Sequence, residues 1–104
     1  MLKSLEELVN IIHERKNLKT EKSYTNKLLN DKNMCVTKVN EEINELLEAI
    51  ENNNNKVHEA ADVLYHLFVL LESSGIKIED VMKELKKSQN INWSPIKIIF
   101  LLTL

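Results

Sequence analysis

The sequence predicts an all-α protein, a single-domain bundle of four to five helices. The chain has 104 residues, a length that suits one domain. Gly and Pro occur once each, which leaves little material for the tight turns that connect strands. Apolar residues recur with helical period along most of the chain. A chain this short buries a modest core and often gains stability by association.

Composition and charge exclude several classes of partner. The net charge is −2, so nothing indicates a basic surface for nucleic acid. No apolar run follows Lys3, so the N-terminus does not resemble a signal peptide. The single cysteine, Cys35, excludes an intramolecular disulfide and is typical of a reducing compartment. We therefore expect a cytoplasmic protein in which Cys35 is a small packing residue rather than a nucleophile.

The first helix is predicted to begin at Ser4, a candidate N-cap, with Glu7 completing a capping box. It ends near Lys16, and the polar residues 16–22 predict a loop. Its apolar stripe consists of Leu5, Leu8, Ile11 and Ile12.

A short second helix follows Ser23, a further N-cap candidate, and Leu28 and Leu29 can anchor it. After a break at 30–33, a long helix is predicted over about 34–51. Its apolar stripe consists of Val36, Val39, Ile43, Leu46, Leu47 and Ile50.

Four asparagines at 52–55 separate this helix from the next, because Asn is a poor helix former and a good turn residue. The next helix is predicted over about 56–73, and Gly75 is a suitable residue to follow its end. Its core face consists of Val57, Ala60, Ala61, Leu64, Leu67, Phe68 and Leu71. A last helix is predicted over about 77–87, with a stripe of Ile78, Val81, Met82 and Leu85.

The character of the chain changes after the last helix, so we expect a domain over 1–88 and a separate tail over 89–104. Trp93, Ser94 and Pro95 break the helical pattern, and the apolar run I-K-I-I-F-L-L-T-L follows. This run is too short to span a membrane, which takes about 20 residues. The apolar tail 91–104 could dock on the domain or on a second subunit, and if exposed it would favour aggregation.

Two acidic groups flank the asparagine break. Glu41, Glu42 and Glu45 precede it, and Glu59 and Asp62 follow it. Residues three apart lie on one face of a helix, so each arm of the predicted hairpin presents a carboxylate pair to one side. Four converging carboxylates repel one another unless a cation binds, and Mg²⁺ takes oxygen ligands and accepts phosphate oxygens. The spacing therefore suggests a Mg²⁺ site for a polyphosphate, although such carboxylates more commonly form a solvated face.

Lys38 and His66 lie beside these carboxylates on their helices. Lys38 could reach a phosphate, but an ordinary ion pair with Glu42, four residues on, is the simpler interpretation. His66 could contact substrate or hold a carboxylate, although a lone histidine near an apolar face is more often structural. Asp62 has apolar neighbours in A-A-D-V-L-Y, so its burial would be costly without a ligand or partner.

The acidic motifs E-E-x-x-E and E-x-x-D resemble the signature of the MazG-like superfamily of all-α nucleoside triphosphate pyrophosphohydrolases. Four segments resemble more closely the phosphoribosyl-ATP pyrophosphohydrolase family of histidine biosynthesis. They are L-E-E-L-x-x-x-I-x-x-R-K near the start, S-Y-T-x-K-L-L at 23–29, K-V-x-E-E-x-x-E at 38–45 and E-A-A-D-V-L-Y-H-L-F-V-L-L at 59–71. The ending G-I-x-I-E-D-V-M-x-E-L also fits, so the resemblance covers residues 5 to about 88.

This resemblance implies Mg²⁺-dependent hydrolysis of phosphoribosyl-ATP to phosphoribosyl-AMP and pyrophosphate, by a homodimer with its sites near the subunit interface. By position it implies Mg²⁺ ligands at Glu42, Glu45, Glu59 and Asp62. Glu41 would either support the metal ligands from outside or orient water, and the catalytic residues implied are Glu41, Glu42 and Glu45. Lys27 and Lys38 become candidate phosphate contacts, and Tyr24 and His66 become candidate substrate-pocket residues.

Two features depart from the family pattern. Asn40 stands where the family usually has Gly, and the tail after about residue 90 matches no part of the family. No cyclohydrolase portion precedes the domain, so we expect the monofunctional form. Two alternatives stay open: a MazG-like hydrolase of free or damaged (d)NTPs, and a non-catalytic helical dimerisation module whose stability would not respond to Mg²⁺.

Overall fold

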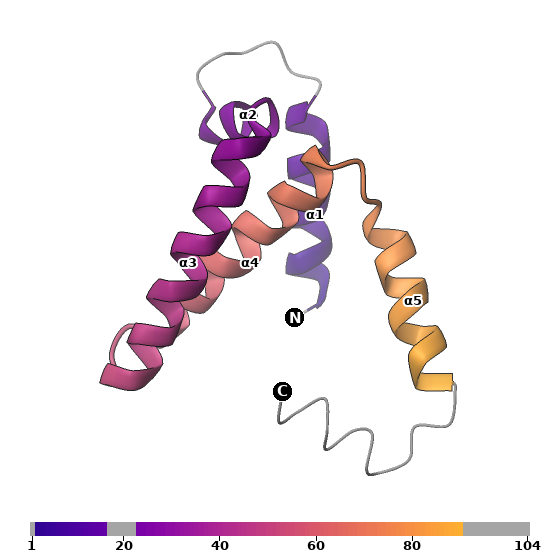
Figure 1. Cartoon of the computed structure of the whole chain (residues 1–104). Helices are drawn as coiled ribbons and strands as arrows, with labels where there is room; N and C mark the ends of the chain where they lie inside the picture. The colour runs from indigo at the N-terminus through magenta and orange to yellow at the C-terminus, as the bar shows by residue number, and fades with distance from the viewer. Residues whose placement is uncertain (1, 17–22, 91–104) are drawn as a thin grey trace.

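The computed structural model describes residues 2–16 and 23–90, and these residues form helices and short connections without any strand. The all-α prediction is therefore confirmed. In chain order the helices are α1 (Leu2–Lys16), α2 (Tyr24–Leu29), α3 (Lys32–Asn52), α4 (Lys56–Ser73) and α5 (Ile78–Asn90) (Figure 1). Of the loop predicted over 16–22, residues 17–22 lie outside the described residues, as do residues 91–104 of the tail predicted over 89–104. Lys16 ends α1, and residues 89–90 belong to α5.

The helix starts depend on local caps. Ser23 caps α2 as predicted, since its side chain accepts a hydrogen bond from the backbone N–H of Asn26. Asp31 caps α3 in the same way through Met34, so α3 begins two residues before the predicted start. The N-cap predicted at Ser4 is wrong, because α1 already begins at Leu2 and Ser4 lies inside its first turn.

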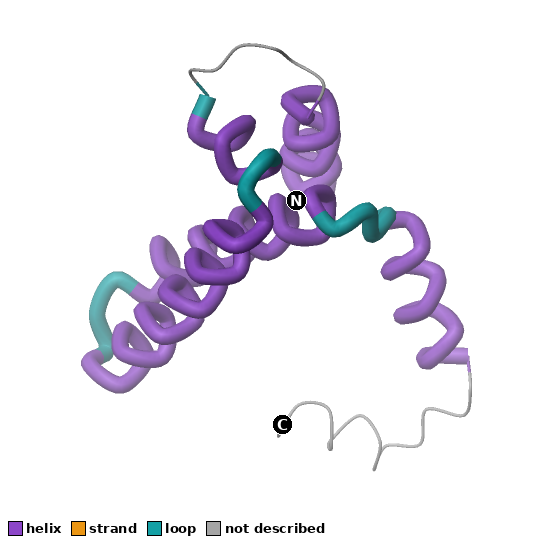
Figure 2. The backbone as a smooth tube through the Cα atoms, turned by 45° about the horizontal axis from the view of Figure 1, so that its top comes forward, coloured by secondary structure: helices purple, strands orange, loops and turns teal. Residues whose placement is uncertain are grey.

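Helices α3 and α4 form an antiparallel hairpin, and this is the most extensive helix pair of the fold (Figure 2). The connection uses Asn53 and Asn55, whose φ angles are +51° and +57°. Asn tolerates this left-handed conformation better than most residues with a Cβ atom. The asparagine run is therefore the turn that sets α4 beside α3.

The core lies at the end of the hairpin where α1 and α2 pack against it. Cys35 has the packing role predicted for it: it is buried, its thiol donates to the carbonyl of Leu28 at 2.8 Å, and burial raises its pKa. The buried apolar cluster is Ile12, Leu28, Leu29, Cys35 and Val69.

The predicted core faces of α3 and α4 are largely wrong for the single chain. On α3 the buried positions are Cys35, Val39, Glu42 and Ala49, which face α4. Most of the predicted stripe lies outside this contact, and Leu47 is 59% exposed. Val57 on α4 is 86% exposed because the far half of the hairpin extends beyond the other helices. We name the exposed apolar set the hairpin apolar surface: Val36, Ile43, Leu47, Ile50, Val57, Leu64 and Leu67.

Helix α5 stands apart from the other four and is absent from the closely packed helix pairs (Figures 1 and 2). Ile78 and Val81 of its predicted stripe are partly covered, whereas Met82 and Leu85 are exposed. Among the described residues, no helix combines the length and apolar character that crossing a membrane requires.

Candidate metal centre

Three carboxylates converge between the arms of the hairpin. Glu42 and Glu45 lie one turn apart on α3, and Glu59 lies in the first turn of α4. Each side chain offers one oxygen, and these oxygens all lie within 4.8 Å of one another. We name these three residues the acidic cluster. The hairpin brings them together because the asparagine turn places the start of α4 beside the second half of α3.

The acidic cluster contains oxygens that no protein group satisfies. Glu42 is 8% exposed, and within the described part of the chain its Oε2 is buried without a hydrogen-bond partner. The same is true of Glu59 Oε2. A buried charged acceptor without a partner is destabilising, so a cation or a proton on these oxygens would stabilise the cluster.

Proton affinities in the cluster are shifted accordingly. Burial raises the pKa of Glu42, and the neighbouring Glu45 raises it further, while His66 opposes the shift. Burial also raises the pKa of Glu59, with Glu45 again adding to the shift and His58 opposing it. Without a cation, therefore, Glu42 and Glu59 tend to retain protons that ordinary glutamates release.

Asp62 belongs to a second group that shares Glu59. Ligand atoms of His58, Glu59 and Asp62 also lie within 4.8 Å of one another. His58 Nε2 is 3.2 Å from Asp62 Oδ2. Asp62 still acts on Glu42 electrostatically, so all four predicted ligands lie near one another, although they do not form one group. Sequence reasoning missed His58; its position four residues before Asp62 was the available signal.

Tyr24 and His66 lie together on the α2 side of the cluster. The Tyr24 hydroxyl is 3.0 Å from His66 Nε2, and the other ring nitrogen, Nδ1, is 2.8 Å from the carbonyl oxygen of Asp62. A carbonyl can only accept, so Nδ1 carries a proton. Burial raises the pKa of Tyr24, so its hydroxyl is available to donate to Nε2. The structure thus joins the two predicted pocket residues through one hydrogen bond.

The two predicted phosphate-binding lysines have different surroundings. Lys38 Nζ is 3.1 Å from Glu41 Oε2, so the ion pair forms with the residue three positions on rather than with the expected Glu42, four positions on. Glu41 belongs to neither acidic group. The Lys27 side chain has no hydrogen bond or ion pair with any other residue of 2–16 and 23–90, and the structure does not connect it to the cluster.

The donor set fits a hard divalent cation. Every ligand atom in the acidic cluster is a carboxylate oxygen, the type that Mg²⁺ prefers. The orphaned oxygens of Glu42 and Glu59 are available for such an ion. The all-helical fold and the position of this cluster between two antiparallel helices place the chain in a class: helical proteins with a carboxylate site suited to a divalent cation.

Comparison with known proteins gives the particular family. The sequence profile described as phosphoribosyl-ATP pyrophosphohydrolase matches residues 5–89, and the chain belongs to this family. It is similar to the phosphoribosyl-ATP pyrophosphatase of Clostridium acetobutylicum, with 43% identity over 88 residues that cover 80% of this chain and 78% of that protein. A protein of the same name from Sulfurisphaera tokodaii is 44% identical over 86 residues, which cover 80% of this chain and 92% of that protein.

A longer relative shares the same region. The chain is 39% identical over 94 residues to the histidine biosynthesis bifunctional protein, chloroplastic, of Arabidopsis thaliana. The match covers 83% of this chain but 34% of that protein, so the chain corresponds to about a third of it.

Proposed function

We propose that this chain hydrolyses phosphoribosyl-ATP to phosphoribosyl-AMP and pyrophosphate, the second step of histidine biosynthesis. Its membership of the phosphoribosyl-ATP pyrophosphohydrolase family carries the proposal. The convergence of Glu42, Glu45 and Glu59 supports it, because a polyphosphate substrate requires a cation between itself and a carboxylate site.

In this proposal Mg²⁺ is held by the acidic cluster together with Asp62. When bound, the ion supplies charge neutralisation for the polyphosphate and lowers the pKa of water. The carboxylates position the ion and would repel the substrate in its absence. Glu41 is the proposed water-orienting residue, and its ion pair with Lys38 supports a fixed orientation.

The substrate is proposed to lie on the α2 side of the cluster. Lys38 acts electrostatically on Tyr24, so a cation and a hydroxyl flank this side. The bond from Tyr24 to His66 ties α2 to α4 and fixes this wall of the pocket. Lys27 lies on the same short helix as Tyr24 and has no ion partner among the described residues, which leaves its ammonium group available to a phosphate.

We also propose that the protein is a homodimer that acts in the cytoplasm. The hairpin apolar surface supports the dimer, because a single small domain rarely exposes so many large apolar side chains. Leu47→Asp should reduce the mass measured by sedimentation equilibrium from that of two chains to that of one. A natural chain that sediments as a monomer would refute the dimer. The free, buried Cys35 supports a reducing compartment.

The test is pyrophosphate release from phosphoribosyl-ATP, with and without Mg²⁺. The natural chain should release pyrophosphate only with Mg²⁺, and Glu45→Gln should abolish the release because it removes an oxygen anion of the cluster. Glu48→Gln is the matched control, since Glu48 lies one turn further along α3 and is exposed outside both acidic groups. Release from a dNTP alone would favour the (d)NTP hydrolase, and no release from either substrate would favour a non-catalytic module.

A further inference from the structure

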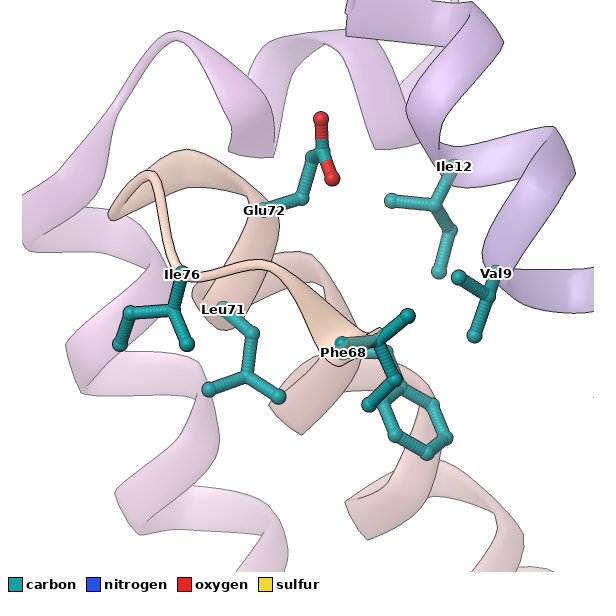
Figure 3. Close-up of a pocket in the computed structure, with 7 residues that line it drawn as sticks. Val9, Ile12, Phe68, Leu71, Glu72 and Ile76 are labelled. Atoms are coloured by element: carbon teal, nitrogen blue, oxygen red, sulfur yellow. The ribbon is translucent and has the colours of Figure 1, made fainter. Parts of the chain in front are cut away.

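A groove runs between α1 and α5, on the opposite side of α4 from the acidic cluster. Three adjoining hollows form it, and Val9 of α1 and Ile78 of α5 line all three. Figure 3 shows its narrow inner end, where Val9 and Ile12 of α1 lie across from Phe68 and Leu71 of α4. The two wider sections have volumes of about 600 and 580 Å³.

The two wide sections differ in chemistry. The section near the α4–α5 connection has many polar residues, and some of them pair: His13 Nδ1 is 2.8 Å from Glu72 Oε1, and Lys16 donates to the Glu72 carbonyl. The other section is walled largely by apolar side chains from three helices. These are Leu5 and Val9 of α1, Phe68 of α4, and Ile78 and Met82 of α5. Glu6, Asn10 and Glu79 complete the lining, so this section suits an occupant that is mainly apolar.

Such an occupant would stabilise helix α5. It has 13 residues, and an isolated helix of this length is marginal in water. Its apolar residues at 78, 81, 82 and 85 lie on one side with helical spacing, yet it packs closely on no other helix within the described residues. A segment that fills the groove would cover this side and join α5 to α1.

We propose that the segment 96–104 of the same chain occupies this groove. The segment is I-K-I-I-F-L-L-T-L, in which only Lys97 and Thr103 are not apolar. A segment that is apolar on all sides needs cover on more than one side, which a groove between two helices provides and a flat surface does not. The family match ends at residue 89, so the segment lies outside the matched residues.

The lengths and the point of attachment agree with this occupant. The tail continues directly from α5, which forms one wall of the groove. Fully extended, the 14 residues after α5 span about 46 Å, more than twice the length of about 20 Å that a 13-residue helix covers. The chain can therefore turn back through residues 91–95 and follow α5 toward Ile78. A short connection also gives an effective concentration in the millimolar range, which favours the same chain over a second copy.

Disulfide trapping in the full-length chain tests this proposal. Met82→Cys combined with Phe100→Cys places one thiol in the groove wall and one in the segment. The matched control is Glu84→Cys with Phe100→Cys, because Glu84 is exposed and lies on the other side of α5. The native Cys35 is buried and does not compete. We expect the disulfide within one chain to form about tenfold faster, or more, for the groove pair than for the control.

Two outcomes would overturn the proposal. Equal rates for the two pairs would mean that the segment does not enter the groove. Disulfides only between two chains, seen as a doubled mass without reductant, would assign the groove to the tail of a second copy.

Hydrogen exchange gives an independent readout. Phe100→Asp should increase the exchange of α5 amides by about tenfold or more, whereas Phe100→Leu should leave it unchanged. Equal exchange in both variants would show that the segment does not cover α5.

Discussion

The replacement Glu42→Gln should change the stability of the protein in opposite directions with and without Mg²⁺. The substitution keeps the size and shape of the side chain and removes its negative charge. Glu42 is 8% exposed, its Oε2 has no partner among the described residues, and burial, with a further contribution from Glu45, raises its pKa. Without metal the variant should therefore be more stable than the natural protein, and with Mg²⁺ it should be less stable.

The size of both effects follows from the surroundings of Glu42. A buried charged acceptor without a partner costs about 1–3 kcal/mol, and we take the lower end because the exposed Glu45 leaves the cluster open to screening by solvent. For a chain of this length, 1 kcal/mol corresponds to about 4–8 °C in Tm. Mg²⁺ at a hundred times its Kd stabilises the natural protein by about 2.7 kcal/mol. A variant that binds no metal lacks this stabilisation but keeps its gain of about 1 kcal/mol. In excess Mg²⁺ its unfolding free energy should therefore be about 1.7 kcal/mol lower than that of the natural protein.

Thermal unfolding followed by circular dichroism, in EDTA and in excess Mg²⁺, measures both effects. Glu48→Gln makes the same chemical change on the same helix outside the acidic groups, and it should shift Tm little under either condition. The reasoning is refuted if Glu42→Gln lowers Tm in EDTA, or if Mg²⁺ stabilises the variant as much as the natural protein.

Three further measurements test the site and the fold. Because the pKa values of two carboxyls in the acidic cluster are raised, the metal-free native state binds more protons than the unfolded state above pH 4.5, the ordinary value. Its Tm, measured relative to the Mg²⁺-bound protein, should therefore fall as pH rises through this range, and a constant difference would contradict the assigned burial. Asn53→Ala should lower the unfolding free energy in urea by about 1–2 kcal/mol, because φ at Asn53 is +51°. Asn54→Ala changes a residue without positive φ and should lower the unfolding free energy much less. An equal decrease for the two variants would exclude a role for the left-handed turn. Tyr24→Phe should cost about 1 kcal/mol in the same assay by leaving His66 Nε2 without its donor, and an unchanged midpoint would show that this bond contributes nothing.

The helix order could be predicted from the sequence because its signals are local. The asparagine run marks the turn between α3 and α4, and the predicted range of α4 agrees with Lys56–Ser73. Ser23 caps α2 because a hydroxyl at that position reaches a free backbone N–H. The same chemistry also explains the errors. Asp31 caps α3 although it lay inside the predicted break, and Ser4 was not needed as a cap because Leu2 and Lys3 are themselves good helix formers.

Part of the candidate site could be predicted for the same reason. Residues three apart on one helix must lie on one side, so the pairing of Glu42 with Glu45 follows from sequence alone. Which residue of α4 meets that pair depends on the register across the turn, and the structure places Glu59 there with Asp62 one turn away. Similarly, the Lys38 side chain could reach either Glu41 or Glu42, and in its observed rotamer it pairs with Glu41. Pairings between helices, and choices among rotamers, are set by packing that the helical period does not specify.

Helical period also does not tell whether an apolar side faces its own chain or another molecule. The inner side of α3 buries Glu42 between Val39 and Ala49, whereas Ile43 and Leu47 lie exposed on the outside. An ordinary surface helix buries its apolar side and exposes its charges, whereas α3 buries one glutamate and exposes several large apolar side chains. A cation would satisfy the carboxylate on the inside, and a second subunit would cover the apolar residues on the outside. The orientation of this one helix therefore supports both the metal centre and the dimer. The two proposals can be tested separately: the change of Tm with Mg²⁺ tests the metal centre on the inner side, and sedimentation equilibrium tests the dimer on the outer side.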